Sequence, residues 1–313
     1  MISNYKTSKN FTLRGLRKII RTFFDLSPIF INQFFAKQGY TYLISRNKSF
    51  YFKSSIYGTN LKIIAHSLSN IDRVATSNKK INDDFVYSYS DPIYGIFSLN
   101  LKNWVMIDIG ANVGTYSLAC TAAGAKKIYS IEPGNTFEKL NNNVKLNNLE
   151  KIISTFNFGI ANFEGNMRWY EELSNVGNAH LVKDITDIDL SKTNTLLNKK
   201  FMEVKVKKLT SFIKENNINK IDLIKIDVEG MENEILESIE EIIKFQKPIF
   251  LIETHRIMSD IVGYDCITPI FNRMYNHNYE SYHFNGNKFE KFIYPNFPMD
   301  TFFIPNNKYV INK

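Results

Sequence analysis

Cysteine is scarce in this sequence: Cys120 and Cys266 are the only two among 313 residues. Disulfide-stabilised domains need several cysteine pairs, and a cysteine-based zinc site needs closely spaced thiols. Neither pattern is present, so a disulfide scaffold and a thiolate zinc site are both excluded. We expect both thiols to be reduced, as in a cytoplasmic protein.

Long apolar runs are also absent. A helix that crosses a bilayer needs about 18 or more consecutive apolar residues. The best candidate, residues 19–35, is interrupted by Arg21, Asp25 and Pro28. The same interruptions argue against a signal peptide, because no continuous apolar segment or small-residue cleavage site follows the basic start. We therefore expect a chain without a transmembrane helix, located in the cytoplasm.

Acidic residues are rare in the first third of the chain. Residues 1–103 carry 15 Lys and Arg against 5 Asp and Glu, and the remainder carries 24 against 26, so the net charge of +8 originates near the N-terminus. Within residues 11–26, apolar side chains recur at helical spacing and basic ones fill the other face, which predicts a basic amphipathic helix. This helix can pack on its own domain or in a homodimer, or lie on an anionic membrane as a peripheral contact. No nucleic-acid recognition motif accompanies the charge, so nucleic acid is not expected as a partner.

The pattern divides the chain into two parts. Residues 1–100 combine the basic helix with short β-like runs, which predicts a small α+β appendage. Over residues 101–313, apolar runs alternate with helical segments, as is typical of an α/β fold with a mostly parallel sheet and helices on both faces. Residues 279–284 and 301–304 are expected to form an antiparallel edge, and the polar residues 171–200 an irregular insertion. The expected parallel strands are residues 105–109, 127–131, 152–158, 221–226 and 249–252, and the expected helices residues 116–123, 137–146 and 231–244.

The first of these strands ends in a turn that contains glycine, from Gly110 through Asn112 to Gly114. In parallel sheets, ligands bind at the carboxyl ends of the strands where the strand order reverses. Glycine allows a tight turn and a close approach of the ligand to the backbone, and the helix that follows offers free N–H groups. Asn112 stands at the second glycine of the dinucleotide pattern G-x-G-x-x-G, which argues against a pyrophosphate cofactor.

Acidic residues at the strand ends favour a cationic ligand that carries a ribose. Asp108 in the first strand disfavours phosphate and suits ammonium or sulfonium groups, both of which S-adenosylmethionine contains. Glu132 ends the second strand, 22 residues after Gly110, near the spacing at which an acid binds ribose hydroxyls; an acid at a helix start is the alternative. Asn157, at the end of the third strand, is a candidate partner of adenine. The predicted cofactor residues are Asp108, Gly110, Asn112, Gly114, Glu132 and Asn157.

A second cluster of ionisable residues follows. Lys225 stands inside an apolar run, where an unpaired charge is costly, and Asp227 lies on the same face of that strand. The next strand ends in Glu253-Thr-His255. If the fourth strand lies between the first and the fifth, these groups converge with Asp108 and perturb one another's pKa values. The candidate catalytic residues are Lys225, Asp227, Glu229 and His255, and the candidate ligands of a divalent cation are Asp227 and Glu253. A purely structural ion pair is the alternative.

The second part of the chain resembles the FkbM family of S-adenosylmethionine-dependent methyltransferases. The resemblance covers about residues 104–256 and rests on the segments VMIDIGANVGTYSLA, SIEPG, IDLIKIDVEGMENEIL and IFLIETH. It implies a Rossmann-like class I methyltransferase fold with S-adenosylmethionine as cofactor. It also implies O-methylation, with acceptors among sugar hydroxyls of cell-surface glycans and hydroxyls of secondary metabolites.

Methyl transfer to a hydroxyl requires a positioned acceptor, exclusion of water and a base. His255, Asp227 and Glu229 are the candidate bases, and Lys225 is a candidate to orient the acceptor. The basic helix suits a glycan still attached to a lipid carrier at the inner face of the membrane. Two alternatives remain: a methyltransferase that acts on protein or RNA, and a non-catalytic cofactor-binding module that serves assembly.

Overall fold

The structure of the chain is a computed structural model that describes part of the sequence. The described residues are 49–56, 59–66, 92–172, 175–182, 199–254, 259, 263–285, 287–296 and 300–306. They form an eight-stranded sheet, a four-stranded sheet and a two-stranded hairpin, with helices around the largest sheet. The predicted helix 11–26 and the candidate residue His255 lie outside the described residues.

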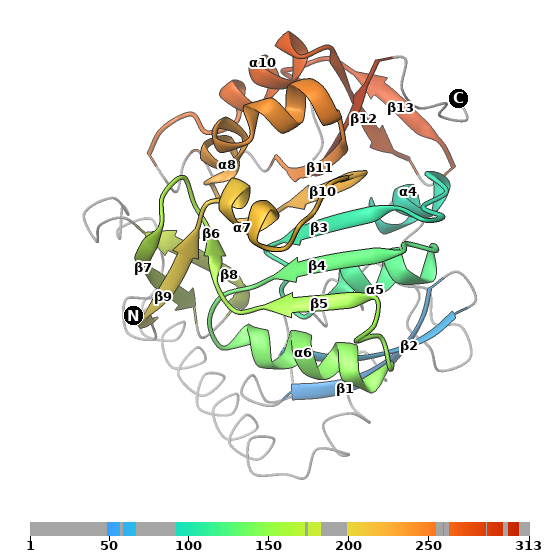
Figure 1. The fold of residues 1–313 in the computed structure, drawn as a ribbon, viewed down its shortest axis with the longest axis vertical. Coiled ribbons are helices and arrows are strands. Elements are labelled where there is room, and N and C mark those ends of the chain that lie inside the picture. The colour runs from blue at the N-terminus through green and yellow to red at the C-terminus, as the bar shows by residue number, and fades with distance from the viewer. Residues whose placement is uncertain are drawn as a thin grey trace, which may run out of the picture.

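The eight-stranded sheet is the framework of the molecule, with the order β13-β12-β14-β11-β10-β3-β4-β5 (Figure 1). The parallel part comprises β11 (Ile249–Glu253), β10 (Leu223–Ile226), β3 (Val105–Ile109), β4 (Lys127–Ile131) and β5 (Ile153–Phe156). The antiparallel edge comprises β14 (Asp300–Pro305), β12 (Tyr279–Phe284) and β13 (Phe289–Phe292). The predicted parallel sheet and its antiparallel edge are confirmed, and β10 lies between β3 and β11 as expected.

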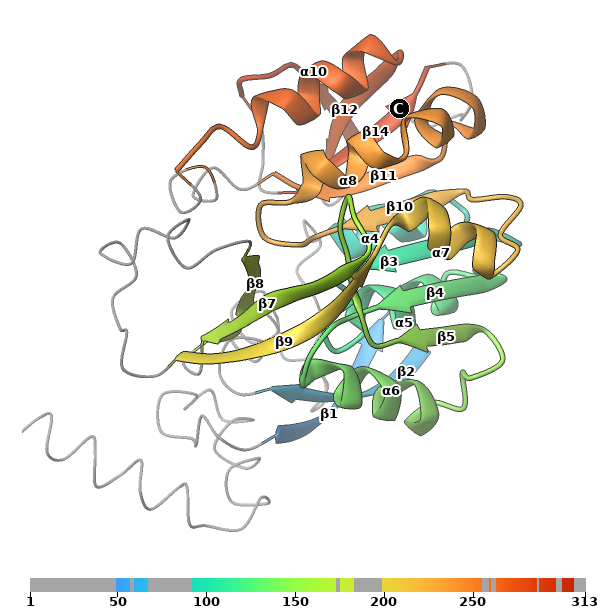
Figure 2. The same ribbon diagram turned by 60° about the vertical axis from the view of Figure 1, so that its left-hand side comes forward.

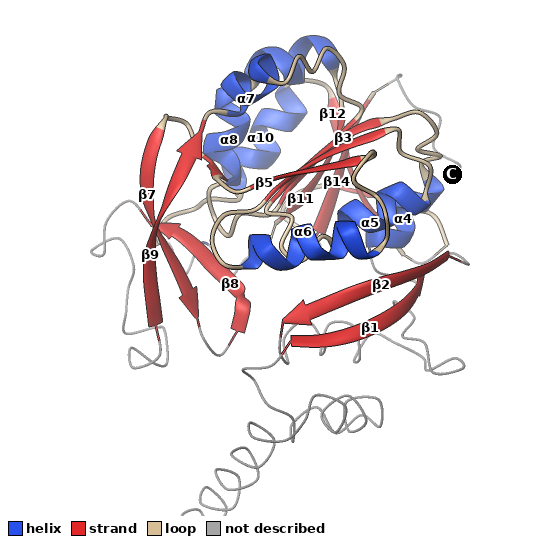
Figure 3. Cartoon of the chain, turned by 60° about the horizontal axis from the view of Figure 1, so that its bottom comes forward, coloured by secondary structure: helices blue, strands red, loops and turns tan. Residues whose placement is uncertain are grey.

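Helices cover both faces of this sheet, which explains why its central strands are apolar throughout. One face is covered by α4 (Pro92–Ser98), α5 (Thr115–Ala122) and α6 (Thr136–Leu146). The other is covered by α7 (Leu209–Glu215), α8 (Glu232–Ser238), the π-helical turn η4 (Ile242–Gln246) and α10 (Thr268–Asn276) (Figure 3). Every residue of β10 and β11 is buried between these two layers.

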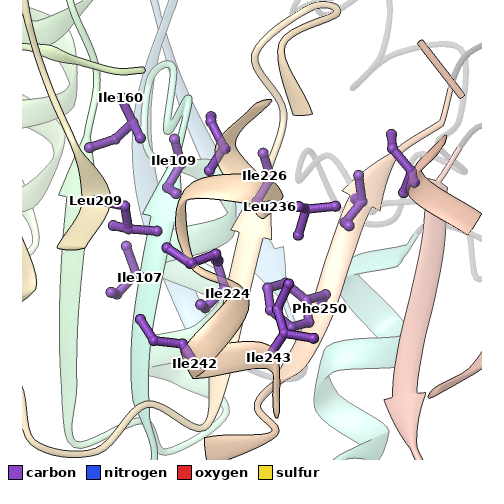
Figure 4. Packing of buried hydrophobic residues seen from close by; sticks show 14 of the residues in the cluster. Ile107, Ile109, Ile160, Leu209, Ile224, Ile226, Leu236, Ile242, Ile243 and Phe250 are labelled. Atoms are coloured by element: carbon purple, nitrogen blue, oxygen red, sulfur yellow. The ribbon is translucent and has the colours of Figure 1, made fainter. Parts of the chain in front are cut away.

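Alternation along the strands divides the core into two clusters. In β3, Ile107 and Ile109 pack with Ile224 and Ile226 of β10 in the cluster under α7 and α8 (Figure 4). Each buried side chain of this size stabilises the fold by about 1.5–3 kcal/mol relative to an exposed one. The residues between them face the opposite layer. Asp108 therefore points toward the side of the sheet that α5 covers.

The four-stranded sheet stands beyond the carboxyl ends of the parallel strands (Figure 2). Its order is β6-β9-β7-β8, with β6 at Gly159–Ile160, β7 at Gly165–Glu172, β8 at Asn175–Val182 and β9 at Lys199–Lys207. The described part of residues 171–200 is thus largely strand and not irregular. The difference arises because β7 pairs with β9 across a long sequence separation, and no local pattern reveals such a pairing.

The hairpin of β1 (Ser49–Ile56) and β2 (Thr59–His66) lies beside α6 (Figure 3). Helix α4 belongs with the large sheet, since Ile93 and Ile96 are buried in its core. The sheet unit therefore begins before residue 101, the boundary expected from the sequence. Among the described residues, no helix is both long and apolar enough to cross a membrane.

Candidate active site

The glycine turn at the end of β3 has the tight geometry that its sequence predicts. Gly110, Asn112 and Gly114 have positive φ angles of 71°, 51° and 91°. A Cβ added at Gly110 would lie 1.8 Å from the backbone oxygen of Asp227, and one at Gly114 would lie 2.7 Å from Leu140 Cδ1. Both positions therefore favour glycine for backbone conformation, and Gly110 also requires it for space, because the atom it would meet belongs to the backbone.

Glu132 ends β4 directly beside this turn. Its Oε2 accepts a hydrogen bond of 2.9 Å from the backbone N–H of Asn112. Burial raises the pKa of Glu132 to about 8, although the Asn112 hydrogen bond and the charge of Lys225 act in the opposite direction. A carboxylate can accept several hydrogen bonds, so this position suits the predicted contact to ribose hydroxyls.

Asp108 lies beneath the turn and is fully buried. Ser117 Oγ of α5 donates to its Oδ2 at 2.5 Å and lies 2.6 Å from Ser130 Oγ. Burial raises the pKa of Asp108 above its usual range, although Lys225 and Ser117 favour the ionised form. The sequence suggested a direct contact between Asp108 and a cationic ligand. The side chain faces α5, because position 108 lies on that face of β3, and its contact with a ligand stays a prediction.

Lys225 joins the glycine turn to the end of β10. Its Nζ donates to the backbone oxygen of Gly110 at 2.9 Å, lies 2.9 Å from Asp227 Oδ2, and lies 3.8 Å from Asp108 Oδ1. Burial alone would lower the pKa of Lys225, but the charges of Asp227 and Asp108 outweigh it and raise the pKa above its ordinary value. Lys225 is thus a buried cation that braces two loops, and its side chain is only 5% exposed.

Three carboxylates gather at the carboxyl ends of β10 and β11. Oxygen atoms of Asp227, Glu229 and Glu253 all lie within 4.8 Å of one another, and we call these residues the carboxylate cluster. Burial, together with the charges of Asp227 and Glu229, strongly raises the pKa of Glu253. Burial and these neighbouring charges thus favour the neutral form of Glu253. Of the five groups expected to converge, Asp108, Lys225, Asp227 and Glu253 lie together at one edge of the sheet, and His255 lies outside the described residues.

The carboxylate loop, residues 227–231, connects β10 to α8 and carries two members of the cluster. Glu229 and Gly230 have positive φ angles of 58° and 109°. The buried Glu232 carboxylate accepts hydrogen bonds from the N–H groups of Val228, at 3.0 Å, and Gly230, at 3.0 and 3.2 Å. Burial raises the pKa of Glu232 to about 7, while these hydrogen bonds favour its ionised form.

Asn157 differs from the buried residues of this site, because it is exposed. It directly follows β5. The neighbouring Phe158 packs against Phe156 and Phe212, with ring centroids 6.1 and 5.6 Å away. Phe158 is thus part of the core. The role of Asn157 toward adenine stays a prediction.

Sequence patterns missed four residues that shape the site. Ser117 and Ser130 are small polar residues on buried faces, and a polar residue in an otherwise apolar stripe is the available signal. Glu232 appears in the sequence as an ordinary acid in the first turn of a helix. Asp300 lies opposite Glu253 in the antiparallel pairing of β14 with β11, and no sequence pattern predicts that contact.

The fold and the site together define a class of protein. A parallel sheet of this order, a glycine turn after its first strand, an acid after its second and polar groups after its fourth are the features of Rossmann-like class I methyltransferases. The FkbM methyltransferase domain matches residues 108–287, more than half of the chain. The chain belongs to this family and is a methyltransferase.

The individual relatives share low sequence identity with this chain. The methyltransferase sdnD of Sordaria araneosa is 26% identical over 184 residues, which cover 52% of this chain and 71% of sdnD. Protein arginine N-methyltransferase 6 of Danio rerio is 30% identical over 113 residues, which cover 29% of this chain and 32% of that protein. The crystal structure of methyltransferase FkbM from Methylobacillus flagellatus KT superposes with a TM-score of 0.40 at 16% identity, over 64% of this chain and 43% of that one.

Proposed function

We propose that this protein is an S-adenosylmethionine-dependent O-methyltransferase whose acceptor is a hydroxyl of a sugar in a cell-surface glycan or of a secondary metabolite. The observation that carries the proposal is the hydrogen bond from Lys225 to Gly110, with its ion pair to Asp227. These contacts join a cofactor-type glycine turn to a cluster of carboxylates. Groups suited to a cofactor and to a proton acceptor therefore meet at one edge of the sheet.

The residues of the turn suit S-adenosylmethionine better than a nucleotide phosphate. Glu132 is placed for ribose hydroxyls, and the nearby Asp108 and Asp227 favour a cation over an anion. The Oδ1 atom of Asp108 has no hydrogen-bond partner among the described residues, as expected for a site that a polar ligand or water completes. When bound, S-adenosylmethionine supplies an electrophilic methyl group.

The carboxylate cluster supports transfer to a hydroxyl, because a base must receive the proton of that hydroxyl. Asp227 and Glu229 are partly exposed, so an acceptor can reach them. The ion pair with Lys225 stabilises the charge of Asp227 and weakens it as a base. Among the described candidates, we therefore propose Glu229 as the proton acceptor. His255, which lies outside the described residues, is the other candidate base.

Calorimetric titration with S-adenosylmethionine, with NAD as the control ligand, tests the cofactor. Saturable binding of the first ligand alone is expected, and Glu132→Gln should weaken it about tenfold or more, because hydrogen bonds to a charged group contribute about 1.5–3 kcal/mol. Transfer of a labelled methyl group is then measured on glycan, small-molecule, protein and RNA fractions. Absence of binding to the wild-type protein would remove the proposal.

A divalent cation is a further proposal for this site. Three carboxylates at this separation offer the hard oxygen ligands that Mg²⁺ and Ca²⁺ prefer, and such an ion can bind an acceptor oxygen. Titration with Mg²⁺ should then release the proton held on Glu253, which unbuffered pH measurement detects. If Mg²⁺ neither binds nor releases a proton, the cluster works without a metal.

Methylation of protein is the second candidate function. The similarity to an arginine methyltransferase over 113 residues favours it, and a cluster of carboxylates suits a cationic guanidinium as well as a hydroxyl. Transfer of label to protein, recovered as methylarginine after acid hydrolysis, would support this alternative over O-methylation.

Membrane contact is proposed on the sequence of residues 11–26 alone. A basic amphipathic helix would bring the enzyme to a lipid-linked glycan at the inner face of a membrane. Neutralising Arg14, Arg17, Lys18 and Arg21 should then abolish co-sedimentation with anionic vesicles. Unchanged co-sedimentation would instead favour the dimer contact, which the sedimentation velocity of the same variant tests.

A further inference from the structure

The carboxylate loop is held in a conformation that its own backbone does not favour. Glu229 has a φ of 58° and Gly230 a φ of 109°. The left-handed region is unfavourable for a side chain such as that of Glu229. Contacts from outside the loop backbone must therefore stabilise this shape.

Glu232 supplies polar contacts of this kind. Its Oε1 accepts from the N–H groups of Val228, at 3.0 Å, and Gly230, at 3.2 Å, and its Oε2 accepts from Gly230 at 3.0 Å. Glu232 is only 2% exposed, so its carboxylate is shielded from water. A buried charged acceptor makes stronger hydrogen bonds than a neutral one, and buried amides are costly without a partner.

The loop that Glu232 holds is in direct contact with the glycine turn. The backbone N–H of Asp227 donates to the oxygen of Ile109 at 3.2 Å. The backbone oxygen of Asp227 occupies the space where Gly110 would carry a Cβ, 1.8 Å from that position. Because the two backbones touch, the carboxylate loop cannot shift without disturbing the turn.

On its outer side the loop packs against the four-stranded sheet. Met231 belongs to a small buried cluster with Ala161, Met167 and Val206, and Val228 packs against it. The loop thus contacts the four-stranded sheet (Figure 2) on one side and the glycine turn of the large sheet on the other. Apolar contacts limit its position as a whole, whereas the hydrogen bonds of Glu232 fix the orientation of its peptide groups.

We propose that Glu232 is a positioning residue that fixes the carboxylate loop, and through it the glycine turn, in the geometry used for methyl transfer. It is buried behind the loop and acts through Asp227 and Glu229. The effect on cofactor binding rests on the proposed function, whereas the role of Glu232 in holding the loop does not. A simpler role is the alternative, in which any acid in the first turn of α8 stabilises that helix through its dipole.

Residue-resolved amide hydrogen exchange of the full-length protein separates these roles. In Glu232→Gln, the remaining acceptor oxygen is uncharged and makes weaker hydrogen bonds, and the amide nitrogen that replaces the other oxygen is a donor and cannot accept from the loop. We expect the amides of Val228 and Gly230 to exchange about tenfold faster, while those of Leu223–Ile226 keep their protection. Glu234→Gln is the matched control, because it removes the same charge from the same turn of α8 while its Oε1 contacts Tyr264 and not the loop.

The cofactor arm uses S-adenosylmethionine as the probe. Its dissociation constant should increase about three- to tenfold in Glu232→Gln and stay unchanged in Glu234→Gln. Unchanged exchange at Val228 and Gly230 in the Glu232→Gln variant would overturn the proposal, and so would equal losses in both variants, which is the result of a dipole effect. If the wild-type protein does not bind the probe, the cofactor assignment fails while the exchange arm still decides the role of Glu232.

If Glu232→Gln does not fold, Glu232→Asp replaces it in the experiment. This variant keeps the charge and shortens the side chain by one CH₂ group. The proposal requires the amides of Val228 and Gly230 to lose protection from exchange in this variant while the amides of strand β10 keep theirs. Simultaneous loss along the loop and the strand would show that Glu232 stabilises the whole domain and would overturn a specific positioning role.

Discussion

The glycine turn and the carboxylate loop lie side by side at the carboxyl ends of β3 and β10, yet different forces shape them. Steric limits determine the turn: Gly110 and Gly114 have positive φ angles, and the backbone of Asp227 leaves no room for a Cβ at Gly110. Buried charge determines the loop, where Glu232 binds the backbone from behind and Lys225 pairs with Asp227. A backbone defined by steric space responds mainly to added side-chain volume, whereas a loop defined by buried charge responds mainly to protonation and to charge removal.

The largest effect is expected from Lys225→Met, because this residue connects the two loops. Removing one partner of a buried ion pair leaves an uncompensated charge and typically costs about 3–5 kcal/mol. We expect urea denaturation to show a loss of about 4 kcal/mol in the free energy of unfolding. Lys291→Met is the control, since the Lys291–Glu280 pair is exposed and should contribute less than about 1 kcal/mol. Similar losses in both variants would contradict the bracing role.

Gly110→Ala tests the steric side of the comparison. Left-handed backbone costs an L residue about 1–2 kcal/mol, and overpacking against Asp227 adds about 1–3 kcal/mol. We expect thermal denaturation to show a loss of about 3 kcal/mol. Gly263→Ala is the control, because Gly263 has a φ of 79° but nothing lies within 4 Å of the added Cβ. This variant should lose about 1 kcal/mol in the free energy of unfolding. Equal losses would show that conformation alone, and not the contact with Asp227, requires glycine at position 110.

Glu132 should make cofactor affinity depend on pH. Its pKa is raised from 4.5 to about 8, so the ligand-free protein holds a proton there at pH 7, and a cationic ligand favours its release. The affinity for S-adenosylmethionine should increase from pH 6.5 to pH 8, by up to about tenfold per pH unit. The stability of the ligand-free fold changes in the opposite direction: the contribution of a raised carboxyl pKa is complete below about pH 4.5 and is lost as the pH rises through 8.

Calorimetry in two buffers with different ionisation enthalpies measures this proton release at pH 7. Glu132→Gln should remove the release and flatten the pH profile. A profile that persists in Glu132→Gln would assign the proton to another group, with Glu232 as the next candidate because its pKa is raised to about 7.

The smallest effect is expected from Glu253→Gln. Burial, Asp227 and Glu229 raise the pKa of Glu253, so glutamine closely resembles its neutral form at pH 7. The free energy of unfolding from urea titration should change by less than about 1 kcal/mol. Asp227→Asn, which loses the ion pair with Lys225, should lower the free energy of unfolding by more than Glu253→Gln does. A loss above about 2 kcal/mol in Glu253→Gln would mean that Glu253 is ionised at neutral pH.

Local patterns were sufficient for the central sheet. The strands 127–131 and 279–284 have the bounds that the apolar runs predicted, and β3 and the turn after it followed from one short segment. The antiparallel pairing of β7 with β9 was not predicted, because the pairing depends on residues far apart in the sequence. Helices α7 and α10 were also missed, since short amphipathic segments acquire their stability from packing.

Residue types predicted the members of the site better than their roles. Lys225 and Asp227 were identified because charges inside an apolar strand need partners. The direction in which each side chain points was harder to predict: Asp108 faces α5 and Ser117, and Glu232 points back into the loop that precedes it. Such directions depend on which face a neighbouring helix covers, and this information is tertiary.

The hydrogen bond from Lys225 to Gly110 joins residues 115 positions apart. Contacts of such long range form late, because the chain between them loses its freedom before the contact is gained. On the ribosome, the strand that carries Lys225 emerges long after the glycine turn, so the nascent turn has no brace until β10 inserts beside β3. The final geometry of the glycine turn therefore depends on a strand that is synthesised more than one hundred residues later.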